Sequence, residues 1–129
     1  MIDASVAAVA AYGTADASVR VLDDSTDDTK DEIDEIVNEY QKKGIDIAVV
    51  RREKRTGYKA GALQAALEIS EAEFIAIFDA DFVPLEDFLL RTVPYFGEDE
   101  KLAIVQSRWG HLNRDFNMLT KAISIGIDV

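Results

Sequence analysis

Apolar residues recur along this chain at two spacings, which predict an alternation of strands and helices. Val19–Leu22 and Ile45–Val50 are short runs rich in β-branched residues, as is typical of strands. Between these runs the apolar side chains return every three or four positions, as on the inner face of a helix: Ile33, Ile36, Val37 and Tyr40. The first half of the chain therefore predicts a strand, a helix and a second strand.

The remaining segments continue this alternation. An alanine-rich helix is expected over residues 1–11, and a loop from Arg51 to Gly57 should lead into a helix from about Tyr58 to Ile69. Phe74–Phe78 is continuously apolar, which is typical of a strand that is covered on both faces. Pro84 suits the first turn of a short helix that runs to about Thr92.

Two more elements are expected near the end of the chain. Leu102–Ser107 reads as a further strand. A closing helix is outlined by Phe116, Leu119, Thr120 and Ile123. Strands that alternate with helices imply an α/β fold, with a mainly parallel sheet and helices on both faces. At 129 residues, the chain is expected to form a single domain over residues 1–129.

Net charge, the lengths of the apolar runs and the absence of cysteine each argue against a class of function or site. The formal net charge is −11, so the broad basic face that nucleic acids require is not expected. The longest apolar runs fall far short of the roughly 20 residues that span a bilayer, and residues 1–11 lack the basic start of a signal peptide. Cysteine is absent, which excludes disulfides and thiolate metal sites and favours an intracellular compartment.

Carboxylate pairs follow two of the predicted strands. Asp23 and Asp24 end the first strand, and Asp79 and Asp81 follow the apolar run 74–78. Because ligands of open α/β sheets bind beyond the carboxyl ends of the strands, we expect both pairs to face one crevice. Two carboxylates one residue apart can hold Mg²⁺ or Mn²⁺, which takes its other ligands from phosphates and water. The competing interpretation is that these acids only end a strand and cap the next helix.

A basic segment lies between the two acidic pairs. Five of the chain's fourteen lysines and arginines fall within nine positions: Arg51, Arg52, Lys54, Arg55 and Lys59. Lys59 begins Lys-Ala-Gly at the predicted start of a helix, where the ammonium group and backbone N–H groups can address one anion. A diphosphate is the anion that this arrangement suits. The alternative is a solvated, charged loop that balances an acidic protein.

Four motifs occur in an order that resembles a known family. They are Leu22–Thr29 (LDDSTDDT), Gly57–Leu63 (GYKAGAL), Phe78–Pro84 (FDADFVP) and Val105–Trp109 (VQSRW). The set resembles processive family 2 glycosyltransferases of the cellulose-synthase-like kind, including plant mannan and glucan synthases. The resemblance extends from about Val19 to the end of the chain. It implies a partial GT-A type, Rossmann-like nucleotide-diphospho-sugar transferase domain.

The resemblance implies a role for each matching site residue. Asp23 and Asp24 match the acidic pair that holds the uridine or guanosine part of the donor. Lys59 matches the lysine that lies near the diphosphate. Asp79 and Asp81 match the Asp-x-Asp motif that binds Mn²⁺ or Mg²⁺ and, through it, the donor diphosphate. The metal then neutralises the charge that develops on the leaving nucleoside diphosphate.

The resemblance also implies features of the whole enzyme. Such an enzyme transfers a hexose from a UDP- or GDP-sugar, with inversion, to a growing polysaccharide or oligosaccharide acceptor. It is an integral membrane protein whose transferase domain lies on the cytoplasmic face. A sheet that lacks a strand leaves open backbone edges, so dimerisation or strand exchange is left open. The sugar, base, acceptor and linkage are not specified by these residues.

The chain departs from the family's pattern in two places. The family's first strand, with its nucleotide-contacting end, should precede Val19, where only the alanine-rich helix is found. The Thr-Glu-Asp motif that supplies the general base has no counterpart before Val129, so the catalytic base is expected to be absent. Gln106–Trp109 is one residue shorter than the family's Gln-x-x-Arg-Trp acceptor motif. We assign no functional role to Trp109, because an aromatic residue just after a strand is typical of packing, or to His111, the sole histidine.

Two other functions fit part of the same pattern. An Asp-x-Asp after an apolar strand also fits a haloacid-dehalogenase-like phosphatase, in which Asp79 would be the nucleophile. That family begins its domain with this strand, whereas here the motif comes late. A non-catalytic receiver-like α/β module would place Asp23, Asp24 and Asp79 at similar strand ends. Release of phosphate from an aryl phosphate, or labelling of Asp79 by acetyl phosphate, would distinguish these two functions.

Overall fold

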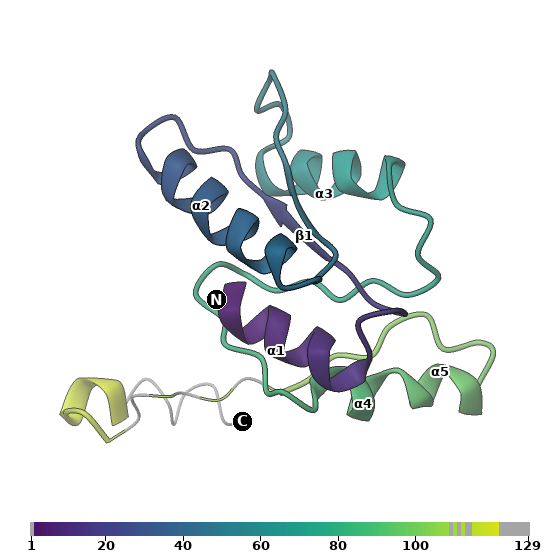
Figure 1. The fold of residues 1–129 in the computed structure, drawn as a ribbon. Coiled ribbons are helices and arrows are strands. Elements are labelled where there is room, and N and C mark those ends of the chain that lie inside the picture. Colours follow the sequence, from purple (N-terminus) through teal and green to yellow (C-terminus); the bar gives the residue numbers. More distant parts are fainter. Residues whose placement is uncertain (1, 109, 111, 113–114, 122–129) are drawn as a thin grey trace.

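The computed structural model describes residues 2–108, 110, 112 and 115–121. The labelled elements in this part of the chain are two parallel strands and five helices, and a further helical turn covers residues 118–121 (Figure 1). In chain order they are α1 (Ile2–Tyr12), β1 (Val19–Leu22), α2 (Thr29–Lys42), β2 (Ile47–Val50), α3 (Tyr58–Glu68), α4 (Phe88–Thr92) and α5 (Pro94–Glu98). The predicted order from the first helix to α3 is therefore confirmed.

Strands β1 and β2 form a parallel ladder in which Val19 pairs with Ile47 and Leu22 pairs with Val50. Helix α2 connects the two strands, as a parallel crossover requires. The pairing continues one step past β1, because the Asp23 N–H donates to the Val50 carbonyl at 3.1 Å. The two strands therefore end side by side, and the residues that follow them start from neighbouring positions.

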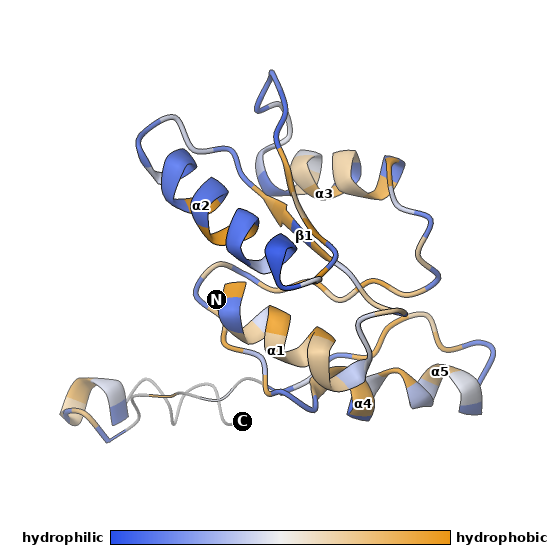
Figure 2. Ribbon diagram, viewed as in Figure 1, coloured by the Kyte–Doolittle hydropathy of each residue, from blue (hydrophilic) through white to orange (hydrophobic). Residues whose placement is uncertain are grey.

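The hydrophobic core lies between one face of the two strands and the helices α1 and α2. Its buried residues are Val6 of α1, Val21 of β1, Val37 of α2 and Ile47 of β2. Figure 2 shows that α2 is mostly hydrophilic and that β1 is hydrophobic. The Tyr40 hydroxyl donates to Asp3 at 2.6 Å and so ties α2 to α1.

Helix α3 packs on the opposite face of the sheet. It contacts β1, and the Arg20 side chain lines the same small concavity as Ala66 and Ile69 near the end of α3. Figure 1 shows α2 and α3 on either side of β1. Helices therefore cover both faces of the parallel pair, as the sequence predicts.

Two predicted strands are not formed. Neither Phe74–Phe78 nor Leu102–Ser107 takes part in a strand ladder, and Ile75 and Ile77 are 48% and 55% exposed. A strand needs a neighbour to satisfy its backbone groups, and the described sheet contains only β1 and β2. An apolar run shows that a segment favours burial. It does not show that a pairing partner lies beside it.

The helical prediction after Pro84 is also corrected. Pro84 is buried in a non-helical segment, and the helix begins at Phe88 instead. Val93 then separates α4 from α5, which starts at Pro94 because proline is favoured in the first turn of a helix. Of the predicted closing helix, Leu119 and Thr120 lie in a short helical turn over residues 118–121. Ile123, Trp109 and His111 lie outside the described residues. None of the helices described is long and apolar enough to cross a bilayer.

Candidate functional site

The ends of β1 and β2 carry two aspartate–arginine pairs that point to opposite faces of the sheet. Because successive side chains of a strand alternate between the two faces, Asp23 and Arg51 lie on the face of α2. Asp24 and Arg52 lie on the face of α3. Each aspartate is opposite the arginine that the ladder register assigns to it. The adjacent carboxylates at positions 23 and 24 therefore have different surroundings.

Asp23 is a buried anchor for α2. The Arg51 Nε donates to its carboxylate at 2.7 Å, and the Ser25 backbone N–H donates at 2.9 Å. Arg51 also donates to Asp34 and to the Lys30 carbonyl, both of α2. Burial raises the pKa of the Asp23 carboxyl, but the hydrogen bonds from Ser25 and Arg51 outweigh that effect and leave its pKa below the ordinary value. Its side chain is only 2% exposed.

Asp24 is held by Arg52 on the other face. The Arg52 Nε and Nη2 donate to the two carboxylate oxygens at 3.0 and 2.5 Å, a two-pronged geometry that favours the charged forms. The hydrogen bond from Arg52 is the main reason that the pKa of Asp24 lies below its ordinary value. Arg55 approaches the same carboxylate at 3.9 Å. The Asp24 side chain is 20% exposed, so solvent reaches it.

The turn before α3 has an unusual backbone. Gly57 has φ 73°, and Tyr58, the first residue of α3, has φ 45°. This left-handed region is open to glycine but disfavoured for tyrosine. The Tyr58 side chain is 83% exposed and therefore gains little from packing. Lys59 follows directly, so the direction of its side chain depends on how this turn is held.

Lys59 forms an ion pair with Asp79, twenty residues further along the chain. The contact brings the start of α3 to the turn that follows residues 74–78. The Phe82 N–H donates to the Asp79 carbonyl at 2.9 Å, so Asp79 and Asp81 belong to one tight turn. Asp81 is exposed. The lysine of the Lys-Ala-Gly motif and the Asp-x-Asp motif are thus adjacent in space.

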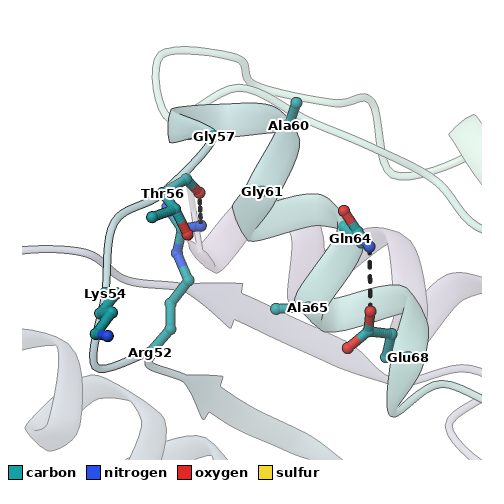
Figure 3. Close-up of a pocket in the computed structure, with 9 residues that line it drawn as sticks. All are labelled: Arg52, Lys54, Thr56, Gly57, Ala60, Gly61, Gln64, Ala65 and Glu68. Atoms are coloured by element: carbon teal, nitrogen blue, oxygen red, sulfur yellow. Dashed lines mark hydrogen bonds between the residues drawn. The ribbon is translucent and has the colours of Figure 1, made fainter.

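Two concavities lie beside α3. One of about 490 Å³ runs along the side of α3 (Figure 3), lined by Arg52, Lys54, Thr56, Gly57, Ala60, Gly61, Gln64, Ala65 and Glu68. The other, of about 250 Å³, lies beside Ser18 and Arg20. Neither is the shared crevice that the sequence predicts, because neither is lined by any of the five predicted site residues: Asp23, Asp24, Lys59, Asp79 and Asp81. Among the described residues, ion pairs join Asp23 to Arg51, Asp24 to Arg52 and Lys59 to Asp79.

The sequence places Arg51 and Arg52 in a basic segment that is expected to bind a diphosphate. In the structure, both arginines form ion pairs with aspartates. Their pairing could have been read from the strand pattern, since residues 23 and 24 and residues 51 and 52 each follow a strand of four residues. Arg52 also donates to two backbone carbonyls, and the residue pattern does not predict these contacts. Lys59 is the cation of the segment that reaches the Asp-x-Asp turn.

Comparison with protein families gives one match over nearly the whole chain. The family described as Glycosyl transferase family 2 matches residues 1–124. This match supports a GT-A type fold, of which the parallel strands and flanking helices described here are a part. It decides against the haloacid-dehalogenase-like and receiver-like alternatives for the same carboxylates.

Curated relatives agree with this family. The chain is 43% identical over 114 residues to glucomannan 4-beta-mannosyltransferase 9 of Arabidopsis thaliana. The aligned region covers 85% of this chain and 21% of the relative. The chain is also 43% identical over 114 residues to glucomannan 4-beta-mannosyltransferase 1 of Cyamopsis tetragonoloba, covering 85% and 22%. The chain therefore spans about a fifth of the length of these relatives. No solved structure matches it.

Proposed function

The chain belongs to glycosyl transferase family 2, and on that premise we propose that it is the nucleotide-sugar-binding part of a hexosyltransferase. The donor is a UDP- or GDP-hexose, and the acceptor is a growing polysaccharide or oligosaccharide. The mannosyltransferase names of the relatives support a hexose donor and a polysaccharide product. Inversion at the transferred carbon is proposed from the family.

The ion pair between Lys59 and Asp79 is the observation that carries this proposal. A donor diphosphate needs a cation beside it and a divalent metal to bridge its oxygens. Lys59 supplies the first, and the turn of Asp79 and Asp81 supplies carboxylates for the second. The two motifs lie twenty positions apart in sequence, and the proximity of their side chains supports a single diphosphate site beside both.

The two aspartates after β1 are assigned different roles. Asp24 is partly exposed and lies on the face of α3, so we assign it the contact with the uridine or guanosine part of the donor. Asp23 is buried and committed to Arg51. It contributes to the nucleotide site by holding the end of β1 and the start of α2, and hence the backbone next to Asp24.

The residues of the Asp-x-Asp turn fit Mn²⁺ or Mg²⁺. Among the described residues, no three His, Asp or Glu side chains gather closely enough to form a complete metal site. Two carboxylates alone suit an ion that takes its remaining ligands from phosphates and water, as these two ions do. We therefore propose Asp79 and Asp81 as the protein ligands. When bound, the metal stabilises the negative charge of the departing nucleoside diphosphate.

The acceptor half of the reaction is not assigned to these residues. The general base that deprotonates the acceptor hydroxyl in the family has no match here, so we propose donor binding, without transfer, as the activity of the isolated chain. For the whole enzyme we propose an integral membrane protein with this domain on the cytoplasmic face.

Equilibrium binding tests the proposal. Isothermal titration of the chain with UDP, GDP and their glucose and mannose conjugates, with and without Mn²⁺, should identify at least one nucleotide sugar whose binding needs the metal. Uridine and guanosine provide the matched ligands without phosphate. If none of these nucleotides binds in the presence of Mn²⁺, the donor-binding role is ruled out.

A further inference from the structure

The guanidinium group of Arg52 joins the segment after β1 to the turn before α3. It holds the Asp24 carboxylate after β1, donates to the Thr56 carbonyl at 2.7 Å and donates to the Tyr58 carbonyl at 2.9 Å. The Arg52 side chain is only 13% exposed. A planar group with five N–H donors can serve several acceptors at once, which lysine cannot reproduce.

The two carbonyls that Arg52 contacts lie on either side of Gly57. They therefore belong to the turn in which Gly57 and Tyr58 both have a left-handed backbone. A non-glycine residue stays in that region only where its surroundings hold it. The hydrogen bonds from Arg52 provide that restraint directly before Lys59. Figure 3 shows the Arg52 side chain reaching from the end of β2 to Thr56.

Gly61 makes room for this contact. A Cβ atom at position 61 would lie 2.0 Å from the Thr56 carbonyl oxygen and 2.6 Å from the Arg52 Nη1. These distances are shorter than any real contact of a Cβ atom, so the turn or the arginine would have to move. The backbone of Gly61 itself is not left-handed. The absence of a side chain is therefore required by the neighbours of Gly61.

We propose that Arg52 is a positioning residue that holds the turn before α3 so that Lys59 faces the donor diphosphate, and that Gly61 is needed to admit it. Arg52 acts through the Thr56 and Tyr58 carbonyls, which lie directly before Lys59. Its own charge is committed to Asp24 and is not needed for the phosphates. This inference rests on the proposed donor-binding function and adds a residue that acts only through Lys59.

A double-mutant cycle on the full chain tests the inference. The Kd of whichever of UDP and GDP binds more tightly is measured with Mn²⁺ for the unchanged chain, Arg52→Gln, Lys59→Ala and the double variant. Arg52→Gln should weaken the binding of the nucleoside diphosphate roughly tenfold, and this effect should largely vanish when Lys59 is already alanine. The corresponding nucleoside without phosphate should lose much less affinity. If Arg52 only stabilised the fold, its substitution would weaken the binding of both ligands to the same extent, with or without Lys59.

Two further variants keep the test valid if Arg52→Gln does not fold. Arg52→Lys keeps a cation beside Asp24 but loses the carbonyl contacts, so it should reproduce the selective loss of diphosphate. Gly61→Ala should do the same, whereas Gly97→Ala, where an added Cβ meets nothing within 4 Å, should bind as the unchanged chain does.

The outcomes separate the two proposals. Failure of the unchanged chain to bind any nucleoside diphosphate with Mn²⁺ overturns the donor-binding function, and the role of Arg52 with it. Normal binding by the unchanged chain, together with an equal effect of Arg52→Gln in the presence and absence of Lys59, overturns the positioning role alone.

Discussion

Lys59 and Asp79 form an ion pair, although the two side chains are assigned different partners at the proposed donor site. Lys59 is assigned to the diphosphate, and Asp79 is assigned to the metal. A metal at Asp79 would compete with the lysine for the carboxylate. Lysine, once released, becomes available for phosphate. The contact therefore couples the two binding events, and each should strengthen the other.

Lys59→Ala should have opposite effects on the two ligands. Without nucleotide, the variant should bind Mn²⁺ more tightly, because the competing ammonium group is gone. With Mn²⁺ present, it should bind UDP or GDP roughly tenfold more weakly, with little change for uridine or guanosine. Titration calorimetry measures both. Lys101→Ala, which removes an exposed cation elsewhere, is the control. If Lys59→Ala instead binds Mn²⁺ more weakly in the absence of nucleotide, the proposed competition between Lys59 and the metal for Asp79 is wrong.

Asp81→Asn should abolish metal-dependent donor binding and leave the fold intact. Asp81 is exposed and lies in a turn whose backbone hydrogen bond is made by Asp79 and Phe82. The substitution removes charge with almost no change in shape. Far-UV circular dichroism checks the fold, and calorimetry with UDP and Mn²⁺ checks the site. Glu100→Gln is the matched control. Unchanged affinity of Asp81→Asn for UDP with Mn²⁺ would remove Asp81 from the metal site.

Asp23 should contribute stability that depends on pH. Its pKa in the folded state lies below the ordinary value of 3.8. The contribution is therefore complete above the unfolded-state pKa and is lost as pH falls through the lower, folded-state pKa. Urea unfolding should show little change between neutral pH and about pH 5, followed by a decline below about pH 4. Asp23→Asn should make that decline shallower.

At neutral pH, the same Asp23→Asn change should lower the free energy of unfolding by about 1–3 kcal/mol, because a charged hydrogen bond in a buried position is lost. Asp46→Asn provides the comparison. Its pair with Arg20 is exposed on both sides, so the substitution should have little effect. Equal destabilisation by the two variants would argue against the anchoring role of Asp23.

Tyr58→Gly should not destabilise the chain, although it removes a large side chain. The tyrosine has a left-handed backbone that costs about 1–2 kcal/mol for a residue with a Cβ atom, and its side chain is 83% exposed. Tyr95→Gly, in the ordinary backbone of α5, should destabilise by about 1 kcal/mol. Urea unfolding of both variants gives the difference. A larger loss for Tyr58→Gly than for Tyr95→Gly would mean that the tyrosine side chain itself holds the turn.

The elements that the sequence predicts well are those set by local spacing. The apolar stripe of α2, the β-branched runs of β1 and β2, and the helix that starts at Tyr58 all match the structure. Phe74–Phe78 shows the limit of this reasoning. Its composition is that of a buried strand, but a strand exists only where another strand pairs with it, and the composition of one segment does not specify its neighbour.

The candidate site was partly predictable for the same reason. The carboxylates that follow predicted strands identify Asp23, Asp24, Asp79 and Asp81 as candidates, although the strand predicted before Asp79 is not formed. The division of Asp23 and Asp24 between two faces follows from strand alternation. The contacts of Arg52 were not predictable, because they depend on the left-handed turn at Gly57 and Tyr58, which directs two carbonyls toward the guanidinium.

Paramagnetic broadening by Mn²⁺ tests the central claim most directly, because it locates the metal without requiring catalysis. Amide signals of the labelled chain are followed by NMR as Mn²⁺ is added with UDP or GDP. The proposed site predicts that broadening begins at Asp79–Asp81 and extends to Lys59 at the start of α3. Broadening that begins instead at the acidic first turn of α2, around Asp31 and Glu32, would contradict the assignment of the metal and of the donor diphosphate.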